Sequence, residues 1–449
     1  MPMTIGVRRE DLSKTGEKRV AITPHTAKPL LENGHQLLVQ PGIHDLSGDN
    51  KRAFGDQAYT DVGAEISEDL SDAQVVFGLK EVESAQLLPE KTYLFFSHTH
   101  KGQVKNRGML QAMMEKQITL IDYELIVDDK EERLVTAFTY FAGYAGMTDS
   151  LWTLGKRWEM AGIPSPFARI PQSVEREDLP KIKEDIREAG KLIAAEGTPA
   201  SQPPVIVTIM GRGKTSAGSK TMLELLPHEY IEADQVEDIY RNGDRTKIYI
   251  LVIGIKYMFR PKPGAEHLIV GTDKYAVHRA YNAHPDQFES NLDQFLPYTT
   301  ILMNCILWSP EFPRLITRDK MAGWYQEDQT LQVIGDITCD PEGSIEFSKE
   351  TWIDDPVYIY NPGTREASDG FEGDGIAVMA VTNLPCEFPG DASEQFSSEL
   401  MDLILQLLEA DHQAETLEEA GFPEEMAKAT ILWKGKLTEK YGYMEEFVD

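Results

Sequence analysis

The sequence predicts an α/β protein built from two doubly wound domains with a cleft between them. Apolar strand-like segments alternate with helix-like segments through residues 1–125, which is typical of a parallel sheet covered by helices. A second apolar strand, "VIVTIM", runs directly into a glycine-rich turn and another helix. A chain of 449 residues also exceeds the size at which a single hydrophobic core usually stops growing.

The elements of the first half can be placed in order. "TIGVRRE" reads as a short strand that runs into charged residues, and "HQLLVQPG" reads as the next strand. Between them, Thr23 is expected to cap a helix that has Pro24 in its first turn and Gly34 just past its end. Three later segments complete the predicted sheet, "AQVVFGLKE", "KTYLFFSHTH" and "QITLIDYE".

The second half begins with a long apolar segment over 137–160, which we interpret as a buried connecting helix. "LPKIKEDIREAGKLIAAEG" has apolar residues at steps of three and four, as an amphipathic helix requires. "KIYILVIG", "TILMNCILW" and "LQVIGDI" are further predicted strands, and the polar stretch 366–375 is a predicted loop. We therefore expect one domain from residues 1–145 with the returning segment 380–449, and a dinucleotide-binding domain from 146–379.

Composition excludes several classes of protein. A formal net charge of -30 disfavours nucleic acid, because phosphates require a basic surface. No apolar run approaches the roughly 20 residues that span a bilayer, and the N-terminus shows no signal-peptide pattern. Cys305, Cys339 and Cys386 are far apart and odd in number, which suits a reducing cytoplasm, and no metal-ligand spacing is present.

The glycine-rich turn is the first candidate binding site. Gly211, Gly213 and Gly218 lie between an apolar strand and a helix, which is the context of a Rossmann-like dinucleotide site. The third glycine comes two residues later than in the usual pattern, and turns of this kind also occur without a ligand. The adjacent "GKT" suggests the phosphate loop of an ATPase, but that motif requires glycine where Thr208 stands.

Two polar residues follow neighbouring predicted strands. Lys80 follows "VVFGL" and His98 follows "YLFFS", and the carboxyl ends of parallel strands meet at one edge of a sheet. Lysine and histidine can both transfer protons there, although a solvated loop lysine and a turn-capping histidine are the alternatives. His100 and Lys101 crowd the same turn, so the residue types alone leave the catalytic pair open.

Arginine residues near these strands are candidate carboxylate ligands, since guanidinium groups pair with carboxylates through two hydrogen bonds. Arg8, Arg9 and Arg19 surround the first strand and the turn after it, and Arg133 follows the acidic stretch "DDKEE". For any one of them, a surface ion pair is the alternative interpretation.

These segments resemble a known family. "EKRVAITP", "FGLKEV", "TYLFFSHTHKGQ", "GDITCDPEGSIEF" and "NLPCEFPGDAS" resemble the lysine–2-oxoglutarate reductase module of aminoadipic semialdehyde synthase. That module belongs with saccharopine dehydrogenases, alanine dehydrogenases and transhydrogenases. The resemblance extends over residues 5–444 and implies an oxidoreductase that condenses lysine with 2-oxoglutarate and reduces the imine to saccharopine.

The resemblance also implies roles for individual residues of the first domain. Lys80 and His98 match the acid–base pair of the family. Arg19 matches an arginine that holds a substrate carboxylate, and Arg133 resembles a second such contact. Two further residues fall on positions that line the same pocket, Lys101 and Glu124.

In the second domain, Gly211, Arg212, Gly213, Lys214 and Gly218 are the expected cofactor contacts. Asp336 resembles the acidic residue that lies near the nicotinamide in this family. The resemblance implies NADPH, and Arg212 or Lys214 could pair with its 2′-phosphate, whereas relatives of this family usually have small uncharged residues in the turn. Glu232 and Asp234, after the segment "EYIEAD", would instead favour the free ribose of NAD.

Two other functions therefore remain open at the level of sequence. One is a related NAD-dependent amino-acid dehydrogenase, and the other is a non-catalytic relative whose altered turn no longer binds cofactor. In each case we expect small-molecule ligands, no nucleic acid and no membrane, and we leave a homo-oligomer open.

Overall fold

The computed structural model describes residues 2–11, 13–14, 16–42, 52–325 and 330–448. The chain divides into two compact units, of which unit 1 comprises Met1–Ala137 with Pro389–Asp449 and unit 2 comprises Phe138–Phe388. The divisions fall at the first turns of two long helices, α4 (Ala137–Met160) and α11 (Pro389–Glu409). The domain boundaries expected from the sequence, at 145/146 and 379/380, lie fewer than ten residues inside unit 2.

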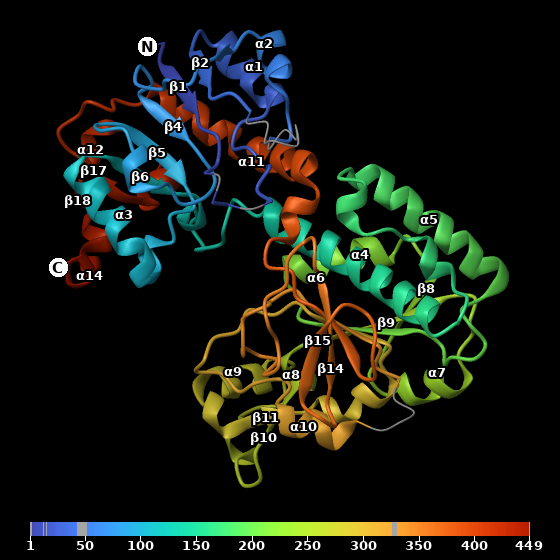
Figure 1. Cartoon of the computed structure of the whole chain (residues 1–449). Helices are drawn as coiled ribbons and strands as arrows, with labels where there is room; N and C mark the ends of the chain where they lie inside the picture. The colour runs from blue at the N-terminus through green and yellow to red at the C-terminus, as the bar shows by residue number, and fades with distance from the viewer. Residues whose placement is uncertain (1, 12, 15, 43–51, 326–329, 449) are drawn as a thin grey trace. The chain divides into compact units, whose positions relative to one another are not determined.

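Unit 1 contains an eight-stranded sheet in the order β18-β17-β6-β5-β4-β1-β2-β3 (Figure 1). All neighbouring pairs are parallel except those of β17, which runs antiparallel to β6 and β18. The strands are β1 (Thr4–Val7), β2 (Gln36–Val39), β3 (Glu65–Ile66), β4 (Val75–Phe77), β5 (Thr92–Phe95), β6 (Thr119–Asp122), β17 (Thr430–Trp433) and β18 (Lys436–Leu437). Because every residue of β4, β5 and β6 is buried, both faces of the sheet centre are covered.

Helices accompany this sheet as the alternating pattern predicts. They are α1 (Pro24–Glu32), α2 (Asp56–Asp61), α3 (Val104–Glu115), α11, α12 (Leu417–Ala420), α13 (Glu424–Lys428) and α14 (Glu445–Val448). The predicted start of α1 is confirmed, because the Thr23 side chain accepts a hydrogen bond from the Thr26 amide and Pro24 occupies the first turn. Gly34 follows the helix with φ +86°, a backbone conformation that favours glycine.

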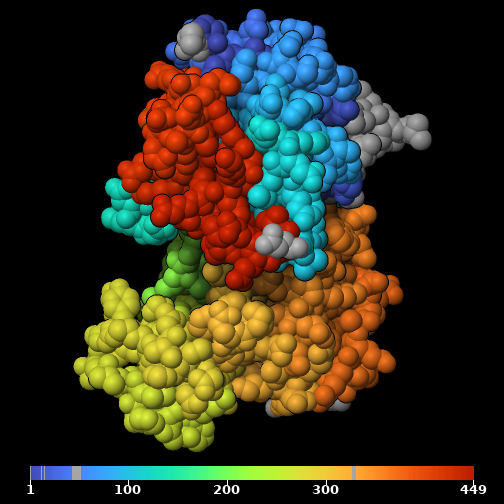
Figure 2. All heavy atoms as spheres, turned by 90° about the vertical axis from the view of Figure 1, so that its left-hand side faces the viewer, coloured from blue at the N-terminus to red at the C-terminus, as the bar shows by residue number. Residues whose placement is uncertain are grey.

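The C-terminal segment is part of unit 1. β17 and β18 extend the first sheet, and α11 packs beside α1, where Ser393 Oγ accepts from the Val20 amide at 2.9 Å. The ring of Phe396 on α11 lies 5.0 Å from that of Tyr123. Figure 2 shows the returning segment in red against the blue and cyan N-terminal residues of the same unit. Residues far apart in the chain therefore share one core.

Unit 2 contains a second eight-stranded sheet, ordered β15-β14-β16-β13-β12-β7-β9-β8, and a separate two-stranded ribbon of β10 and β11. Its strands are β7 (Ile206–Met210), β8 (His228–Ile231), β9 (Ile248–Ile253), β10 (Phe259–Pro261), β11 (Phe288–Ser290), β12 (Ile301–Asn304), β13 (Val333–Asp336), β14 (Val357–Asn361), β15 (Glu366–Asp369) and β16 (Ile376–Met379). Only β14 pairs antiparallel within the large sheet, with β15 and β16. The prediction of an α/β protein with two doubly wound domains is confirmed.

The helices of unit 2 include the predicted connecting and amphipathic helices. They are α4, α5 (Leu179–Glu196), α6 (Lys214–Leu223), α7 (Val236–Asn242), α8 (Ile255–Met258), α9 (Ala276–Ala283) and α10 (Arg318–Trp324). One local prediction is wrong, because the expected loop 366–375 begins with strand β15, which pairs with β14. All four residues of β15 are exposed, so this edge strand lacks the apolar alternation that predicts a half-buried strand. In the part of the chain that the structure describes, no helix is long and apolar enough to cross a membrane.

Helices α4 and α6 approach closely enough that glycine is required at their contact. A Cβ atom built on Gly218 would lie 2.3 Å from the carbonyl oxygen of Tyr140, and one on Gly143 would lie 2.2 Å from that of Thr215. The third glycine of the turn therefore allows helix packing. At Gly213, by contrast, a Cβ would meet nothing within 4 Å.

We expect Gly218→Ala to lower the free energy of unfolding of unit 2 by about 1–3 kcal/mol, because backbone atoms must move to admit the methyl group. Urea unfolding followed by circular dichroism measures this change. The matched control is Gly213→Ala, which adds the same methyl group in open space and should change stability by less than about 1 kcal/mol. Equal effects of the two substitutions would contradict the packing role.

A pair of buried acids joins three elements of unit 2. Asp149 lies on α4 and Glu387 ends the 3₁₀ turn η10 (Leu384–Glu387), and neither side chain is exposed. The Ser173 amide donates to Asp149 Oδ1 at 3.0 Å, which ties a third segment to the pair. Burial raises the pKa of Asp149 to about 6, and burial beside Asp149 raises the pKa of Glu387 well above its usual value.

Candidate active site

Three adjacent parallel strands of unit 1 end at the same edge of the sheet and carry candidate residues. β4 lies between β1 and β5, and β5 lies between β4 and β6. Lys80 follows β4, His98 follows β5 and Glu124 follows β6. Strand order therefore places Lys80 and His98 after adjacent strands at one edge of the sheet, and the convergence of their side chains on one ligand stays a prediction.

The backbone at Lys80 is fixed by a buried carboxylate. Glu10 accepts hydrogen bonds from the Leu79 and Lys80 amides, one at each oxygen and both at 2.8 Å. Burial raises the pKa of Glu10, and the charge of Arg8, 3.8 Å away, partly opposes that rise. This clamp fixes the position from which the half-buried Lys80 side chain extends.

Glu81 connects the lysine segment with the histidine. Its carboxylate lies 2.8 Å from Nδ1 of His98 and 2.7 Å from Nζ of Lys14. Burial raises the pKa of Glu81, but the hydrogen bonds from His98 and Lys14 outweigh it and hold that pKa below its usual value. Because an ionised carboxylate only accepts, Nδ1 of His98 carries the hydrogen and Nε2 is the nitrogen that can exchange a proton with a ligand.

His98 has an uncommon backbone conformation, with φ +53°. The buried carboxylate of Asp122 stabilises it by accepting from the His98 amide at 3.2 Å and from Ser97 Oγ at 2.6 Å. Burial raises the pKa of Asp122, but hydrogen bonds from His100 and Ser97 outweigh it, so this pKa is lowered. A strained turn that is held in this way orients the imidazole.

We expect Glu81→Gln to lower kcat about 10–100-fold, because the carboxylate that orients and stabilises the imidazole is lost. The KM values for lysine and 2-oxoglutarate should change by less than about threefold, because Glu81 contacts the imidazole and not the cations that we expect to bind the substrate carboxylates. The control is Glu83→Gln, an exposed glutamate two residues later, and it should leave kcat unchanged. An unchanged kcat for Glu81→Gln, or a loss that appears only in KM, would contradict the positioning role.

The predicted carboxylate ligand Arg19 is held by the buried carboxylate of Glu17. Its Nε and Nη2 donate to the two oxygens of Glu17 at 2.7 and 2.6 Å, and both side chains are buried. Burial raises the pKa of Glu17, but the charges of Arg19 and Lys80 outweigh it, so this pKa is lowered. Lys80, Glu17 and Arg19 therefore form one charged group, in which Glu17 orients the guanidinium.

A second charged group surrounds Glu124. Lys101 Nζ lies 2.7 Å from Glu124 Oε2, and Arg133 Nη2 lies 2.8 Å from Oε1. Nε2 of His100 lies 3.6 Å from the same Oε2. Burial raises the pKa of Glu124, but Lys101, Arg133 and His100 together lower it. Three of the four predicted substrate-binding residues, Lys101, Glu124 and Arg133, thus lie together, and the 58% exposed Arg133 side chain forms the outer side of the group.

Sequence reasoning missed several residues of this site. They are Glu10, Glu17, Glu81 and Asp122. The chain has 74 acidic residues, so burial alone distinguishes these few from the solvated majority. Glu81 had one signal in the sequence, since it directly follows Lys80 at the end of a strand.

The glycine-rich turn of unit 2 fits a dinucleotide pyrophosphate. Gly211 has φ +99°, and a Cβ there would lie 2.8 Å from the carbonyl oxygen of Cys305. Gly213 is exposed and caps α6 without a side-chain hydrogen bond, so the first amides of the helix face an open surface. An anion such as a pyrophosphate is stabilised at this kind of helix start.

The other predicted cofactor contacts differ in their environment. Arg212 is exposed, and Lys214 begins α6. Asp336 is buried at the end of β13, where it accepts hydrogen bonds from Asn304 Nδ2 at 2.8 Å and from Ser348 Oγ at 2.6 Å. Burial raises the pKa of Asp336. Its oxygens therefore hold the following loop in place, and a direct cofactor contact stays a prediction.

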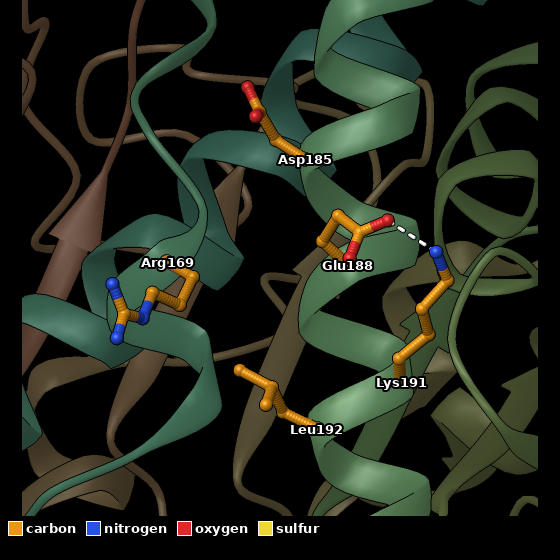
Figure 3. Close-up of a pocket in the computed structure, with 5 residues that line it drawn as sticks. All are labelled: Arg169, Asp185, Glu188, Lys191 and Leu192. Carbon is orange, nitrogen blue, oxygen red and sulfur yellow. Dashed lines mark hydrogen bonds and ion pairs between the residues drawn. The ribbon is translucent and has the colours of Figure 1, made fainter.

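A separate hollow of about 340 Å³ lies on unit 2 between α5 and the 3₁₀ turn η4 (Pro166–Arg169). Figure 3 shows the ion pair of Glu188 and Lys191 on α5 and Arg169 across from them. The side chains of that pair are 54% and 70% exposed, so it contributes little stability. Among the residues that the structure describes, no cluster of three or more His, Cys, Asp or Glu side chains could hold a metal ion.

Comparison with known proteins places this geometry in a family. Residues 6–145 match the alanine dehydrogenase/PNT N-terminal domain, and residues 289–440 match the alanine dehydrogenase/PNT C-terminal domain. An L-alanine dehydrogenase has a similar fold, with a TM-score of 0.62, 17% identity and 99% of both chains covered. A transhydrogenase from Sinorhizobium meliloti has a TM-score of 0.58, 15% identity and coverage of 97% of this chain and 100% of its own.

Proteins with similar sequences identify relatives within this family more specifically than the fold does. The alpha-aminoadipic semialdehyde synthase of Arabidopsis thaliana is 34% identical over 98% of this chain and 41% of its own length. The mitochondrial enzyme of that name from Bos taurus is 31% identical over 98% of this chain and 47% of its own length, so the chain spans less than half of these relatives. The saccharopine dehydrogenase [NAD(+), L-lysine-forming] of Yarrowia lipolytica is 25% identical over 91% of this chain and 94% of its own. The chain therefore belongs to the alanine dehydrogenase/PNT family, and its homologues include alpha-aminoadipic semialdehyde synthases and saccharopine dehydrogenases.

Proposed function

We propose that this protein is an amino-acid dehydrogenase that condenses L-lysine with 2-oxoglutarate and reduces the resulting imine to saccharopine, in a reversible reaction with NADPH. The observation that carries the proposal is that Lys80 and His98 follow adjacent parallel strands, with Glu81, next to Lys80, hydrogen-bonded to the imidazole. The similarity to alpha-aminoadipic semialdehyde synthase over 98% of the chain supports the choice of substrates.

The charged groups of unit 1 suit the dicarboxylic substrate. Arg19, oriented by Glu17, would pair with one carboxylate, and Arg133 and Lys101 would pair with another beside Glu124. Ion pairs hold these cations in position before the substrate binds. Binding therefore costs less side-chain conformational entropy. This arrangement would fix the ketone carbon relative to the attacking amine.

Proton transfer is the chemistry that Lys80 and His98 would supply. The neutral ε-amine of lysine attacks the ketone carbon, and a proton must reach the former carbonyl oxygen. Loss of water then requires a second proton on that oxygen and leaves a carbon–nitrogen double bond. The Lys80 amine and Nε2 of His98 can donate and accept these protons, because each is held at the strand ends with its neighbours fixed.

The nicotinamide group supplies the hydride that reduces the imine carbon. The protein's part is to hold the dinucleotide, for which Gly211 and Gly213 leave room beside the start of α6. Arg212 and Lys214 place positive charge in the same turn. These residues fit an anionic cofactor and support the dehydrogenase class over a non-catalytic relative.

A second candidate is the NAD-dependent, lysine-forming reaction. It is favoured by the match to the Yarrowia lipolytica saccharopine dehydrogenase, which this chain covers over 94% of its length. The substrates would be the same, and only the cofactor and the preferred direction would differ.

A steady-state assay separates these functions. Purified protein receives lysine, 2-oxoglutarate and either NADPH or NADH, and nicotinamide absorbance reports turnover. Turnover with NADPH that requires lysine supports the first proposal, and a preference for NADH supports the second. Turnover with ammonia in place of lysine would contradict both, and no turnover with any amine would favour a non-catalytic relative.

We further propose that the protein acts in the cytoplasm on small molecules, without nucleic acid or membrane partners. The separated cysteines support a reducing compartment, and the net charge of -30 disfavours nucleic acid as a partner. A homo-oligomer fits the proposal but is not required by it. Fractionation of the source cells with detection of the protein tests the location.

A further inference from the structure

The strand order of unit 2 determines which residues lie beside the glycine turn. β7 carries the turn at its end, and its neighbours in the sheet are β12 and β9. β8 follows β7 in the chain but lies at the edge of the sheet, beyond β9. In doubly wound dinucleotide sites, the residue that reads the adenosine ribose follows the strand next to the glycine-turn strand. Here that strand is β9.

This order separates the candidate ribose acids from the turn. Glu232 and Asp234 follow β8, which is two strands from β7, or about 10 Å at ordinary strand spacing. Both are exposed, and the Glu232 amide is bonded to the side chain of Gln235. Acids at this distance cannot hydrogen-bond a ribose that lies against β9. Strand order therefore gives no support to Glu232 and Asp234 as ligands of a free ribose hydroxyl.

Two cations lie at the end of β9, the strand next to the glycine-turn strand. Lys256 follows β9 in the first turn of α8 and is exposed, with Nζ 5.1 Å from the centre of the Tyr257 ring. Arg212 extends from the glycine turn across the end of β9, where its Nη2 lies 3.5 Å from the carbonyl oxygen of Val252. Its Nε lies 3.5 Å from the point that a Cβ of Gly254 would occupy. After β9, the next acidic residue in the chain is Glu266.

We infer that Arg212 and Lys256 together bind the 2′-phosphate of NADP(H) and so select this cofactor over NAD(H). The inference rests on the proposed function, because it assumes that a dinucleotide binds at the glycine turn. A phosphate monoester carries nearly two negative charges, and the planar guanidinium of Arg212 can donate two parallel hydrogen bonds to it. The ammonium of Lys256 adds a compact second charge.

The expected selectivity follows from charge. In a chain with net charge -30, an anionic group is bound only where local cations offset the surrounding acids. A cofactor without the 2′-phosphate leaves Arg212 and Lys256 in solvent and gains nothing from them. We therefore expect NADP⁺ to bind the whole protein at least about tenfold more tightly than NAD⁺.

Equilibrium binding measurements test the proposed 2′-phosphate site without requiring turnover. Calorimetric titration of the full chain with NADP⁺, NAD⁺ and 2′-AMP should show that Arg212→Gln and Lys256→Gln each weaken NADP⁺ about 3–30-fold. The double variant should weaken it about 100-fold and abolish the preference over NAD⁺, whose affinity should change less than about twofold. 2′-AMP should follow NADP⁺, because it carries the same phosphate.

A matched control is present in the same unit. Lys274 is exposed and lies 4.9 Å from the centre of the Tyr275 ring, so Lys274→Gln removes the same charge from the same kind of lysine–tyrosine pair. It should leave both affinities unchanged. Unchanged circular dichroism and melting temperature identify variants that fold normally.

The outcomes of these titrations distinguish a failure of the 2′-phosphate site from a failure of the proposed function. Tighter binding of NAD⁺ than of NADP⁺ by the unaltered protein would overturn the phosphate site while leaving a dehydrogenase intact. Equal weakening of both cofactors in the variants would also overturn it, since the residues would then hold the common pyrophosphate. Failure of the unaltered protein to bind either dinucleotide would remove both the phosphate site and the proposed function.

Discussion

Replacing Lys80 with methionine is expected to lower kcat for lysine-dependent imine formation and reduction by about 10²–10⁴-fold. Methionine fills a similar volume but can neither donate nor accept the protons that carbinolamine formation and dehydration require. The Glu10 clamp on the Lys80 amide does not involve the side chain, so the local backbone should persist. The affinity for the nicotinamide cofactor, which we place on unit 2, should change by less than about twofold.

The control for this substitution is Lys105→Met, at an exposed lysine on α3 of the same unit. It removes one charge and should leave kcat unchanged. Rescue gives a second readout, because small primary amines in solution should restore part of the activity of Lys80→Met if the missing group transfers protons. Near-normal turnover of Lys80→Met would exclude Lys80 from the mechanism.

Local signals in the sequence were sufficient for many elements of the fold. The Thr23 cap and Pro24 fixed the start of α1, and the apolar run over 137–160 gave the extent of α4. Strand order is different, because pairing depends on contacts between distant segments. Nothing within the polar segment around β8 indicates that β9 lies between it and β7, and that order alone decides which residues approach a ribose.

The candidate site likewise combines residues that local sequence indicates with residues that only the fold identifies. The sequence indicates Lys80 and His98 as candidates because each is a polar residue at the end of an apolar strand. It does not indicate the carboxylates that hold these segments, since Glu10 acts from the end of β1 on an amide 70 positions away in the chain. Asp149 lies in the middle of an apolar helix, which is a signal of burial, but its partner Glu387 could be found only from the fold.

The buried pair of Asp149 and Glu387 should make the stability of unit 2 depend on pH. Glu387 has a folded-state pKa well above 4.5, because burial and the neighbouring Asp149 both disfavour its ionised form. Folding at neutral pH therefore requires this carboxyl to take up a proton. The stabilisation is fully present below the unfolded-state pKa and is lost as the pH rises towards the folded-state pKa.

We expect the difference in unfolding free energy between the unaltered protein and Glu387→Gln to change by about 1.4 kcal/mol per pH unit in favour of the variant. This slope applies between the unfolded-state pKa of Glu387 and its raised folded-state pKa. Glutamine cannot ionise, and its amide can donate a hydrogen bond to Asp149, so the variant needs no proton to fold. Urea unfolding at several pH values measures the slope.

The comparison isolates the pair because the other shifted acids, including Glu10 and Asp336 with their raised pKa values, are present in both proteins and cancel in the difference. Glu17 and Glu81 have lowered pKa values, so their contributions vary only below about pH 4.5, and they are the same in both proteins. Glu372→Gln, at an exposed glutamate of unit 2, removes the same charge from solvent and should give no slope. A flat difference for Glu387→Gln would mean that the two carboxyl groups are both ionised in the folded state, with solvent reaching the interface of α4 and η10.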